Sequence, residues 1–158
     1  MAMEIERKFL VNYQLIPPAV SNLPADRFFQ GYLAAKPTVR VRLAERDDEP
    51  ARAWLTIKGP GSIARAEFEY PIPPEDARAL LSLCQATLVK TRRRVAVGTQ
   101  IWELDAFEGA LDGLWLAEVE LDDIDEPIQR PDWVTDEVTH DPAYGNGALA
   151  RRAPGEFR

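Results

Sequence analysis

The chain has 158 residues, of which 46% are hydrophobic and 28% charged, a composition that suits one globular domain and not a disordered chain. Its net charge of −7 argues against broad nucleic-acid binding, which needs a basic surface. The lone cysteine, Cys84, excludes an internal disulfide and a cysteine-based zinc cluster, and the lone histidine, His140, argues against a histidine metal site or a Ser-His-Asp triad. Any metal ligands must therefore be oxygens, which favours magnesium, manganese or calcium.

The N-terminus has no signal-peptide pattern, and the apolar runs are too short to cross a membrane. We therefore expect a cytoplasmic protein with no stable nucleic-acid partner and no membrane partner. One domain over residues 1–158 is expected, with a mobile tail at 151–158. A homodimer is compatible with the sequence, which does not determine the oligomeric state.

Period-2 alternation bounded by turn residues predicts eight strands, at residues 3–11, 27–35, 38–46, 52–59, 64–72, 87–97, 100–108 and 114–122. One helix is predicted to begin at Pro74, with acids in its first turn and Ala77, Leu80, Leu81 and Cys84 on one face. Residues 123–158, which contain several prolines, predict short helices and loops. Many strands with few helices indicate a mainly β (α+β) fold, either an antiparallel barrel or a strongly curved sheet.

Charges of one sign repeat two residues apart along most of these strands. The acidic sets are Glu4 and Glu6, Glu67 and Glu69, Glu103 and Asp105, and Glu118 and Glu120; the basic sets are Arg40 and Arg42, and Lys90, Arg92 and Arg94. A solvent-facing surface explains such alternation on any one strand. However, same-sign neighbours roughly 7 Å apart repel one another, so their repetition predicts a multivalent ligand inside a barrel with a charged lumen.

The two kinds of charge together indicate the ligand. Carboxylates on adjacent strands form a site for a hard cation, and lysines and arginines form a site for a polyanion, with the planar guanidinium suited to phosphate oxygens. Both kinds in one lumen predict a metal-complexed polyphosphate. Phosphoryl transfer on such a ligand needs little beyond positioning and charge stabilisation.

Nine segments also match, in order, the motifs of a known family. They are Glu4-Ile5-Glu6-Arg7-Lys8, Gln30-Gly31-Tyr32-Leu33, Val39-Arg40-Val41-Arg42, Thr56-Ile57-Lys58-Gly59, Arg65-Ala66-Glu67-Phe68-Glu69, Lys90-Thr91-Arg92, Glu103-Leu104-Asp105-Ala106-Phe107, Ala117-Glu118-Val119-Glu120-Leu121 and Tyr144-Gly145-Asn146. Together they resemble the CYTH domain, also called the triphosphate tunnel metalloenzyme family, over nearly the whole chain. The resemblance implies a closed eight-stranded antiparallel β-barrel tunnel with a few peripheral helices, and metal-dependent attack on a triphosphate.

The resemblance also implies roles for individual residues, with Mg²⁺ or Mn²⁺ as the cofactor. Glu4, Glu6, Glu118 and Glu120 would hold metal; Asp105, Glu67 and Glu69 would support a second metal or its waters; and Lys8, Arg40, Arg42, Lys58, Lys90 and Arg92 would bind phosphates. Glu103 and Arg94 are either rim or surface charges, and Arg65 is interpreted as balancing Glu67.

The expected substrate is inorganic triphosphate, cleaved to pyrophosphate and phosphate, because no aromatic cluster that would bind a base or a thiazole ring lies in phase with the lumen charges. The alternatives are a thiamine or nucleoside triphosphatase, an adenylate cyclase, and a non-enzymatic polyphosphate-binding domain. The four metal carboxylates favour an enzyme over the last of these.

A general base for water must come from Lys or Tyr, because histidine is absent from the predicted strands and the carboxylates are engaged with metal. Tyr32 would lie near Arg40 and Arg42 on the neighbouring strand, and nearby cations favour loss of a proton. A pair of Tyr32 and Lys8, with Lys58 as the alternative lysine, is one hypothesis. The other is that the metal alone generates hydroxide and that Tyr32 only hydrogen-bonds a phosphate.

Overall fold

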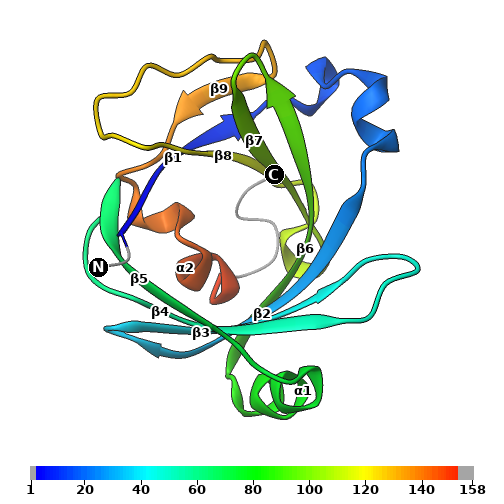
Figure 1. Ribbon diagram of the computed structural model, residues 1–158, viewed down its shortest axis with the longest axis vertical. Helices are drawn as coiled ribbons and strands as arrows, with labels where there is room; N and C mark the ends of the chain where they lie inside the picture. Colours follow the sequence, from blue (N-terminus) through cyan, green and yellow to red (C-terminus); the bar gives the residue numbers. More distant parts are fainter. Residues whose placement is uncertain (1–2, 153–158) are drawn as a thin grey trace.

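A closed antiparallel barrel dominates the computed structural model, which describes residues 3–152 (Figure 1). Its strands are β1 Met3–Val11, β2 Ala25–Ala35, β3 Thr38–Glu45, β4 Arg52–Lys58, β5 Ala64–Pro71, β6 Ala86–Val97, β7 Gln100–Phe107, β8 Trp115–Glu120 and β9 Val134–Glu137. They are hydrogen-bonded in the order β5-β4-β3-β2-β6-β7-β8-β1-β9, and β1 also pairs with β5. That last pairing closes the ring of eight strands, which confirms the predicted barrel.

Helix α1, Pro74–Leu83, packs on the outside of the barrel and begins at the proline predicted to start it. Its Ala77 is fully buried against the outer faces of β3 and β4, where Val41, Leu43 and Ala53 form an apolar cluster. The chain leaves the helix at Cys84, directly beside Gly31 of β2. A Cβ on Gly31 would stand 2.6 Å from the Cys84 sulfur, so only glycine lets the helix end lie this close to the barrel.

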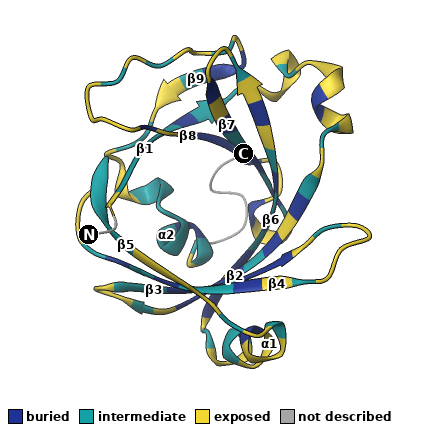
Figure 2. Ribbon diagram, viewed as in Figure 1, coloured by how far each residue is buried: buried dark blue, intermediate teal, exposed yellow. Residues whose placement is uncertain are grey.

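The apolar residues that alternate with the charges lie on the outer wall of the barrel. Phe9, Trp102, Val119 and Trp133 are buried together there, with the Phe9 and Trp102 rings 5.4 Å apart and the Trp102 and Trp133 rings 6.3 Å apart. Figure 2 shows buried stretches along β2, β6 and β8. Because this cluster is outside, the inner faces of the strands can carry charges, except where Leu88, Phe107 and Leu116 pack against Leu149 of the enclosed C-terminal segment.

The C-terminal segment was the part of the fold that the sequence pattern left open. Four-residue β9 pairs with β1, and the backbone N–H of Val138 donates to the carbonyl oxygen of Lys8 at 2.8 Å. A strand this short shows no measurable periodicity, so the sequence predicted only loops and short helices for this segment. After β9 the chain turns inward, and α2, Asn146–Ala150, lies within the barrel ring and not on its periphery (Figure 1).

An ion pair fastens β9 to the outer side of β1. Arg7 donates two hydrogen bonds to Glu137, at 2.6 and 2.8 Å, and these lower the pKa of Glu137 from 4.5 to about 2. A carboxylate with a lowered pKa stabilises the fold above its ordinary pKa, and this contribution is lost as pH falls from about 4.5 towards 2. Because the pair is partly solvated, we expect it to contribute less than about 1 kcal/mol to the free energy of unfolding at pH 7.

Glu137→Gln should therefore lower the urea midpoint slightly at pH 7, and the difference from the unmodified protein should be clearly smaller at pH 2.5. Paired urea titrations at the two pH values measure this. A difference that stays the same at both pH values would assign the effect to something other than the carboxylate charge.

Within residues 3–152, no helix is long and apolar enough to cross a membrane. Of the tail expected at 151–158, only Arg151 and Arg152 belong to the described part of the chain. The rest of that expectation lies outside the described residues.

Candidate active site

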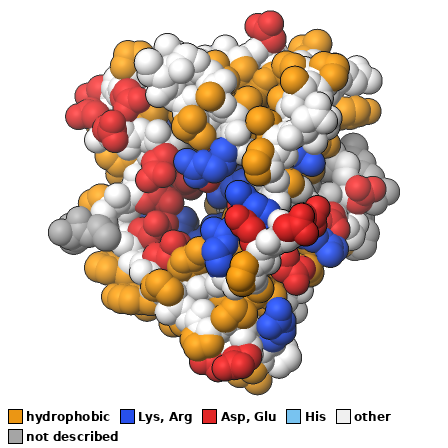
Figure 3. Space-filling view, turned by 45° about the vertical axis from the view of Figure 1, so that its right-hand side comes forward, with side chains coloured by type: hydrophobic (Ala, Val, Ile, Leu, Met, Phe, Trp, Pro, Cys, Tyr) orange, Lys and Arg blue, Asp and Glu red, His pale blue; other side chains and the backbone are white. Residues whose placement is uncertain are grey.

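The barrel encloses a cavity of about 640 Å³, and charged side chains gather around its opening (Figure 3). Within residues 3–152, the lining includes eight basic side chains (Lys8, Lys36, Arg40, Arg42, Lys58, Arg65, Arg92 and Arg151) and eight acidic ones (Glu4, Glu6, Glu67, Glu69, Glu103, Glu118, Glu120 and Asp141). The volume lies in the range of small-molecule sites. A balanced set of both signs suits a ligand that itself combines an anion with a cation.

Most of the residues predicted from the sequence as site residues line this cavity. They include the acids Glu4, Glu6, Glu67, Glu69, Glu118 and Glu120, the bases Lys8, Arg40, Arg42, Lys58 and Arg92, and Tyr32. Lys90 and Asp105 are the exceptions, because neither reaches the cavity wall in the described structure.

Lys90 and Asp105 instead form a fully buried ion pair behind the wall, with the lysine Nζ 2.8 Å from an Asp105 oxygen. Asp105 also accepts two hydrogen bonds from Arg92, at 2.7 and 2.8 Å, which turn the guanidinium towards the cavity. Burial lowers the pKa of Lys90 to about 7, against the opposing effect of Asp105. Burial raises the pKa of Asp105, but the charges of Arg92 and Lys90 outweigh it and the net shift is downward. Asp105 therefore holds Arg92 from the side away from the cavity, and Lys90 contacts Asp105 and not Arg92.

Acidic side chains from the neighbouring strands β1 and β8 lie side by side on one wall of the cavity. The register places Glu6 opposite Glu120 and Lys8 opposite Glu118. Burial, then the charges of Glu118 and Glu4, raise the pKa of Glu6 well above its ordinary value. The ionised form of Glu6 therefore lacks sufficient compensating positive charge from the protein.

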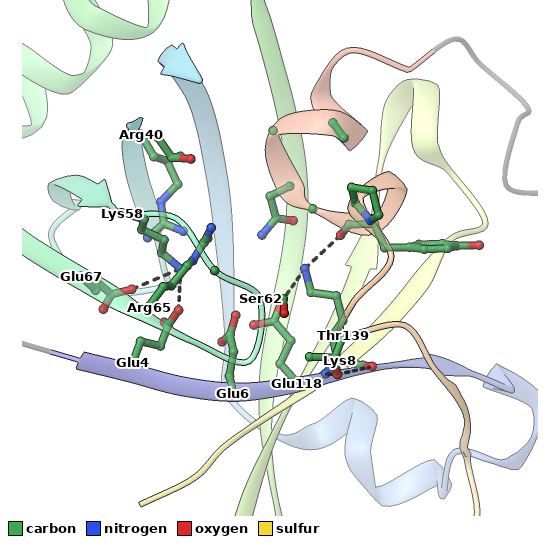
Figure 4. Close-up of a pocket in the computed structure, with 18 of the residues that line it drawn as sticks. Glu4, Glu6, Lys8, Arg40, Lys58, Ser62, Arg65, Glu67, Glu118 and Thr139 are labelled. Carbon is green, nitrogen blue, oxygen red and sulfur yellow. Dashed lines mark hydrogen bonds and ion pairs between the residues drawn. The ribbon is translucent and has the colours of Figure 1, made fainter. Parts of the chain in front are cut away.

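Two lysines form ion pairs with Glu4, Glu67 and Glu118 on this side of the cavity (Figure 4). Lys58 lies 2.9 Å from Glu4 and 3.2 Å from Glu67, and Lys8 lies 3.8 Å from Glu118. These ion pairs orient the acids towards lysines. Among residues 3–152, no three acidic, histidine or cysteine side chains are already gathered as a metal site.

Basic side chains from β3 occupy the opposite wall. Arg40 lies 3.7 Å from Glu69 and donates to Thr56 at 3.3 Å, while its Nε has no hydrogen-bond partner within the described structure. Burial, then the charges of Arg40 and Arg92, lower the pKa of Arg42 to about 9. Both observations suit this wall to binding an anion, since an unpaired buried donor and crowded cations are costly.

The C-terminal segment also lines the cavity, and of its lining residues the sequence analysis singled out only Tyr144, Gly145 and Asn146. Lys8 donates to the backbone oxygen of Tyr144 at 2.9 Å, and His140 is hydrogen-bonded to Ser62 of the loop between β4 and β5 at 2.6 Å. Arg65 and Arg151 also line the cavity. The phase of Arg65 with Glu67 could have identified it, whereas no signal marked Arg151, which lay in the predicted tail.

Comparison with known proteins agrees with this arrangement. The family model described as the CYTH domain matches residues 2–152. The chain belongs to the CYTH family. Among curated CYTH-like relatives, an inorganic triphosphatase of Acetivibrio thermocellus is 34% identical over 164 aligned positions, covering 100% of this chain and 99% of that protein. An inorganic triphosphatase of Nitrosomonas europaea is 35% identical, covering 96% and 99% of the two chains.

Solved structures support the CYTH fold as well. A crystal structure of an inorganic triphosphatase superposes with a TM-score of 0.66 at 33% identity and covers 98% of this chain and 99% of its own. A protein from Pyrococcus horikoshii superposes with a TM-score of 0.55 at 20% identity, over 77% of this chain and 80% of its own, and supports the fold alone.

CYTH membership implies a divalent metal, and the acidic side of the cavity fits one. Carboxylate oxygens are the ligands that magnesium and manganese prefer. Glu6 offers such oxygens in a setting where burial and two neighbouring acids oppose its negative charge. A divalent cation between β1 and β8 would supply the missing positive charge. The raised pKa of Glu6 is therefore the observation that makes the carboxylates of β1 and β8 suitable for a divalent cation.

Proposed function

We propose that this chain is a divalent-metal-dependent inorganic triphosphatase that hydrolyses triphosphate to pyrophosphate and phosphate inside the barrel. The observation that carries the proposal is the cavity itself, with a basic wall from β3 facing an acidic wall from β1 and β8. Two relatives of nearly the same length bear this activity in their names.

Each wall has its own part in the reaction. Arg40, Arg42 and Arg92 bind the phosphate oxygens, with Lys8 and Lys58 released from their carboxylates to join them. Glu4, Glu6, Glu118 and Glu120 hold Mg²⁺ or Mn²⁺, and Glu67 and Glu69 support a second ion or its waters. The bound cation supplies Lewis-acid stabilisation of the charge that builds up on the phosphate oxygens. Lys90 and Asp105 act through Arg92, which they keep aimed at the substrate.

The cavity lining favours a substrate without an organic ring. Among the described lining residues, the aromatic side chains besides His140 are Tyr32 and Tyr144, and no tryptophan or phenylalanine is present. Proteins that bind a nucleobase commonly stack it on aromatic rings. We therefore place inorganic triphosphate ahead of thiamine triphosphate, nucleoside triphosphates and the cyclase reaction.

A phosphate-release panel tests the proposal. With magnesium present, kcat/KM for triphosphate should exceed that for ATP and thiamine triphosphate by at least about tenfold, and pyrophosphate should be a poor substrate because it leaves part of the basic wall unpaired. Glu6→Gln, purified in the same way, controls for contaminating phosphatases. A higher kcat/KM for ATP would favour the nucleotide alternative, and binding without turnover would favour the non-enzymatic one.

Tyr32 is the proposed base, in a pair with Lys8 or Lys58. It lies opposite Arg40 in the register, as the sequence predicted, although its described hydrogen bond is to Gln30 and not to a lysine. Tyr32→Phe should lower kcat by about a hundredfold with a smaller change in KM. Steady-state kinetics of the variant and the unmodified enzyme measure both parameters. An unchanged kcat in the variant would leave hydroxide formation to the metal alone.

A further inference from the structure

Gln30 is a fully buried polar side chain that joins two residues of the cavity wall. Its amide oxygen accepts a hydrogen bond from Arg42 Nε at 2.7 Å, and its amide nitrogen donates to the Tyr32 hydroxyl oxygen at 3.3 Å. Arg42 and Tyr32 line the cavity, whereas Gln30 is absent from the described lining. It can therefore influence the substrate only through its two neighbours.

The chemistry of arginine fixes which way the Gln30 amide points. A guanidinium has donors and no acceptor, so the amide oxygen must face Arg42 and the amide NH₂ must face Tyr32. Two contacts hold the Arg42 side chain beside Gln30. The two residues are directly paired across β2 and β3, and the Arg42 guanidinium lies 4.3 Å from the Phe28 ring centre. The opposite amide orientation would set two donors against each other.

This orientation determines what the Tyr32 hydroxyl can do. Its oxygen accepts a hydrogen from Gln30, so the hydroxyl's own hydrogen is directed elsewhere and is available to a partner in the cavity. The same amide donor would stabilise the oxygen if its proton left.

We propose that Gln30 is a positioning residue that keeps the Tyr32 hydroxyl turned towards the cavity, stabilises its oxygen once the proton has left, and holds the Arg42 guanidinium for phosphate binding. The proposal rests on the triphosphatase function proposed above. It explains why a buried polar side chain stands between Phe28 and Tyr32 on this face of β2, since an apolar residue there would leave the Arg42 Nε without its acceptor.

The test is a double-mutant cycle between Gln30→Glu and Tyr32→Phe, with triphosphate as substrate. The introduced carboxylate still accepts from Arg42 but cannot donate to Tyr32, so the tyrosine hydroxyl would donate to it and turn away from the cavity. Gln30→Glu alone should lower kcat by about tenfold or more, because the carboxylate would hold the tyrosine proton and the oxygen of the base would lose its stabilising donor. It should also raise KM, since the new charge competes with phosphate for Arg42.

In the Tyr32→Phe background the kcat effect of Gln30→Glu should disappear while the KM effect stays. A purely structural role for Gln30 would instead lower kcat by the same factor in both backgrounds, and this result would overturn the proposal. Gln85→Glu is the matched control. It makes the same chemical change at an exposed residue between α1 and β6, and Gln85 is not among the cavity-lining residues. Melting temperatures of all variants report folding.

A second measurement needs no Gln30 variant. In the ¹⁵N-labelled protein, the assigned side-chain amide resonance of Gln30 should shift in Tyr32→Phe, and an unchanged resonance would also overturn the proposal. The two hypotheses fail separately. An unmodified protein that does not cleave triphosphate contradicts the function, whereas an active protein whose Gln30 variants match Gln85→Glu contradicts only the role of Gln30.

Discussion

Removing divalent metal is expected to abolish triphosphate hydrolysis completely. Without a cation, the acids of β1 and β8 present their negative charges to an anionic substrate, and Glu6 in particular lies where burial and its neighbours Glu118 and Glu4 raise its pKa. Bringing a polyphosphate into such a cavity is strongly unfavourable. The lysines that now hold Glu4 and Glu118 would also stay engaged.

Dialysis against a chelator followed by titration with magnesium or manganese measures this dependence. Activity should be undetectable in the chelator and should return with either ion. A readout independent of turnover is the melting temperature, which should rise with metal concentration in the unmodified protein and rise less in Glu6→Gln. Full activity in excess chelator would contradict the metal role of the acidic wall.

Glu6→Gln is expected to lower kcat by about a thousandfold or more while leaving the melting temperature equal or higher. The raised pKa of Glu6 means that its ionised form is disfavoured in the fold, so at pH 7 the charge lowers the free energy of unfolding. Glutamine has nearly the same shape without the charge. The variant should therefore lose function and regain the stability that the charge costs.

The sign of the pKa shift gives a second check on the same variant. Below the ordinary value of 4.5 the unmodified Glu6 is itself protonated in both states, so the stability difference from Glu6→Gln should shrink as pH falls. Urea unfolding at pH 7 and near pH 4 measures it, with Glu45→Gln as the control because Glu45 is exposed at the end of β3. A variant that melts at a much lower temperature would assign Glu6 a structural role.

The sequence predicted the cavity-lining residues on the strands better than those on the loops and the C-terminal segment. Period-2 alternation assigned Glu4, Glu6 and Lys8 to one face, and hairpin pairing placed Tyr32 beside Arg40, because both follow from local strand geometry. The same alternation does not indicate whether a side chain on the inner face reaches the cavity or is buried behind its wall. Lys90 and Arg92 share a face, yet Lys90 is fully buried and only Arg92 reaches the cavity.

Short helices were predicted within residues 123–158, but strand β9 and the position of helix α2 inside the barrel were not, because both depend on tertiary contacts. Strand β9 and helix α2 are 4 and 5 residues long, and elements so short have little stability of their own. They are held by pairing with β1 and by the burial of Leu149 beside Phe107 and Leu116. The loop contact between Ser62 and His140 likewise joins segments far apart in the chain.

Strand β1 carries two of the proposed metal ligands, and all of its partners come from distant parts of the chain. Met3 pairs with Ala66, Glu6 with Glu120 and Val11 with Val134, whereas β2 to β5 and β6 to β8 are joined as successive hairpins. Contacts between distant residues pay the largest loop-closure entropy and form late. We therefore expect the hairpins to form first and the pairing of β1 with β5 and β8 to close the barrel last. During synthesis, β1 would leave the ribosome well before β8, so the proposed metal ligands on these two strands could come together only after β8 has emerged.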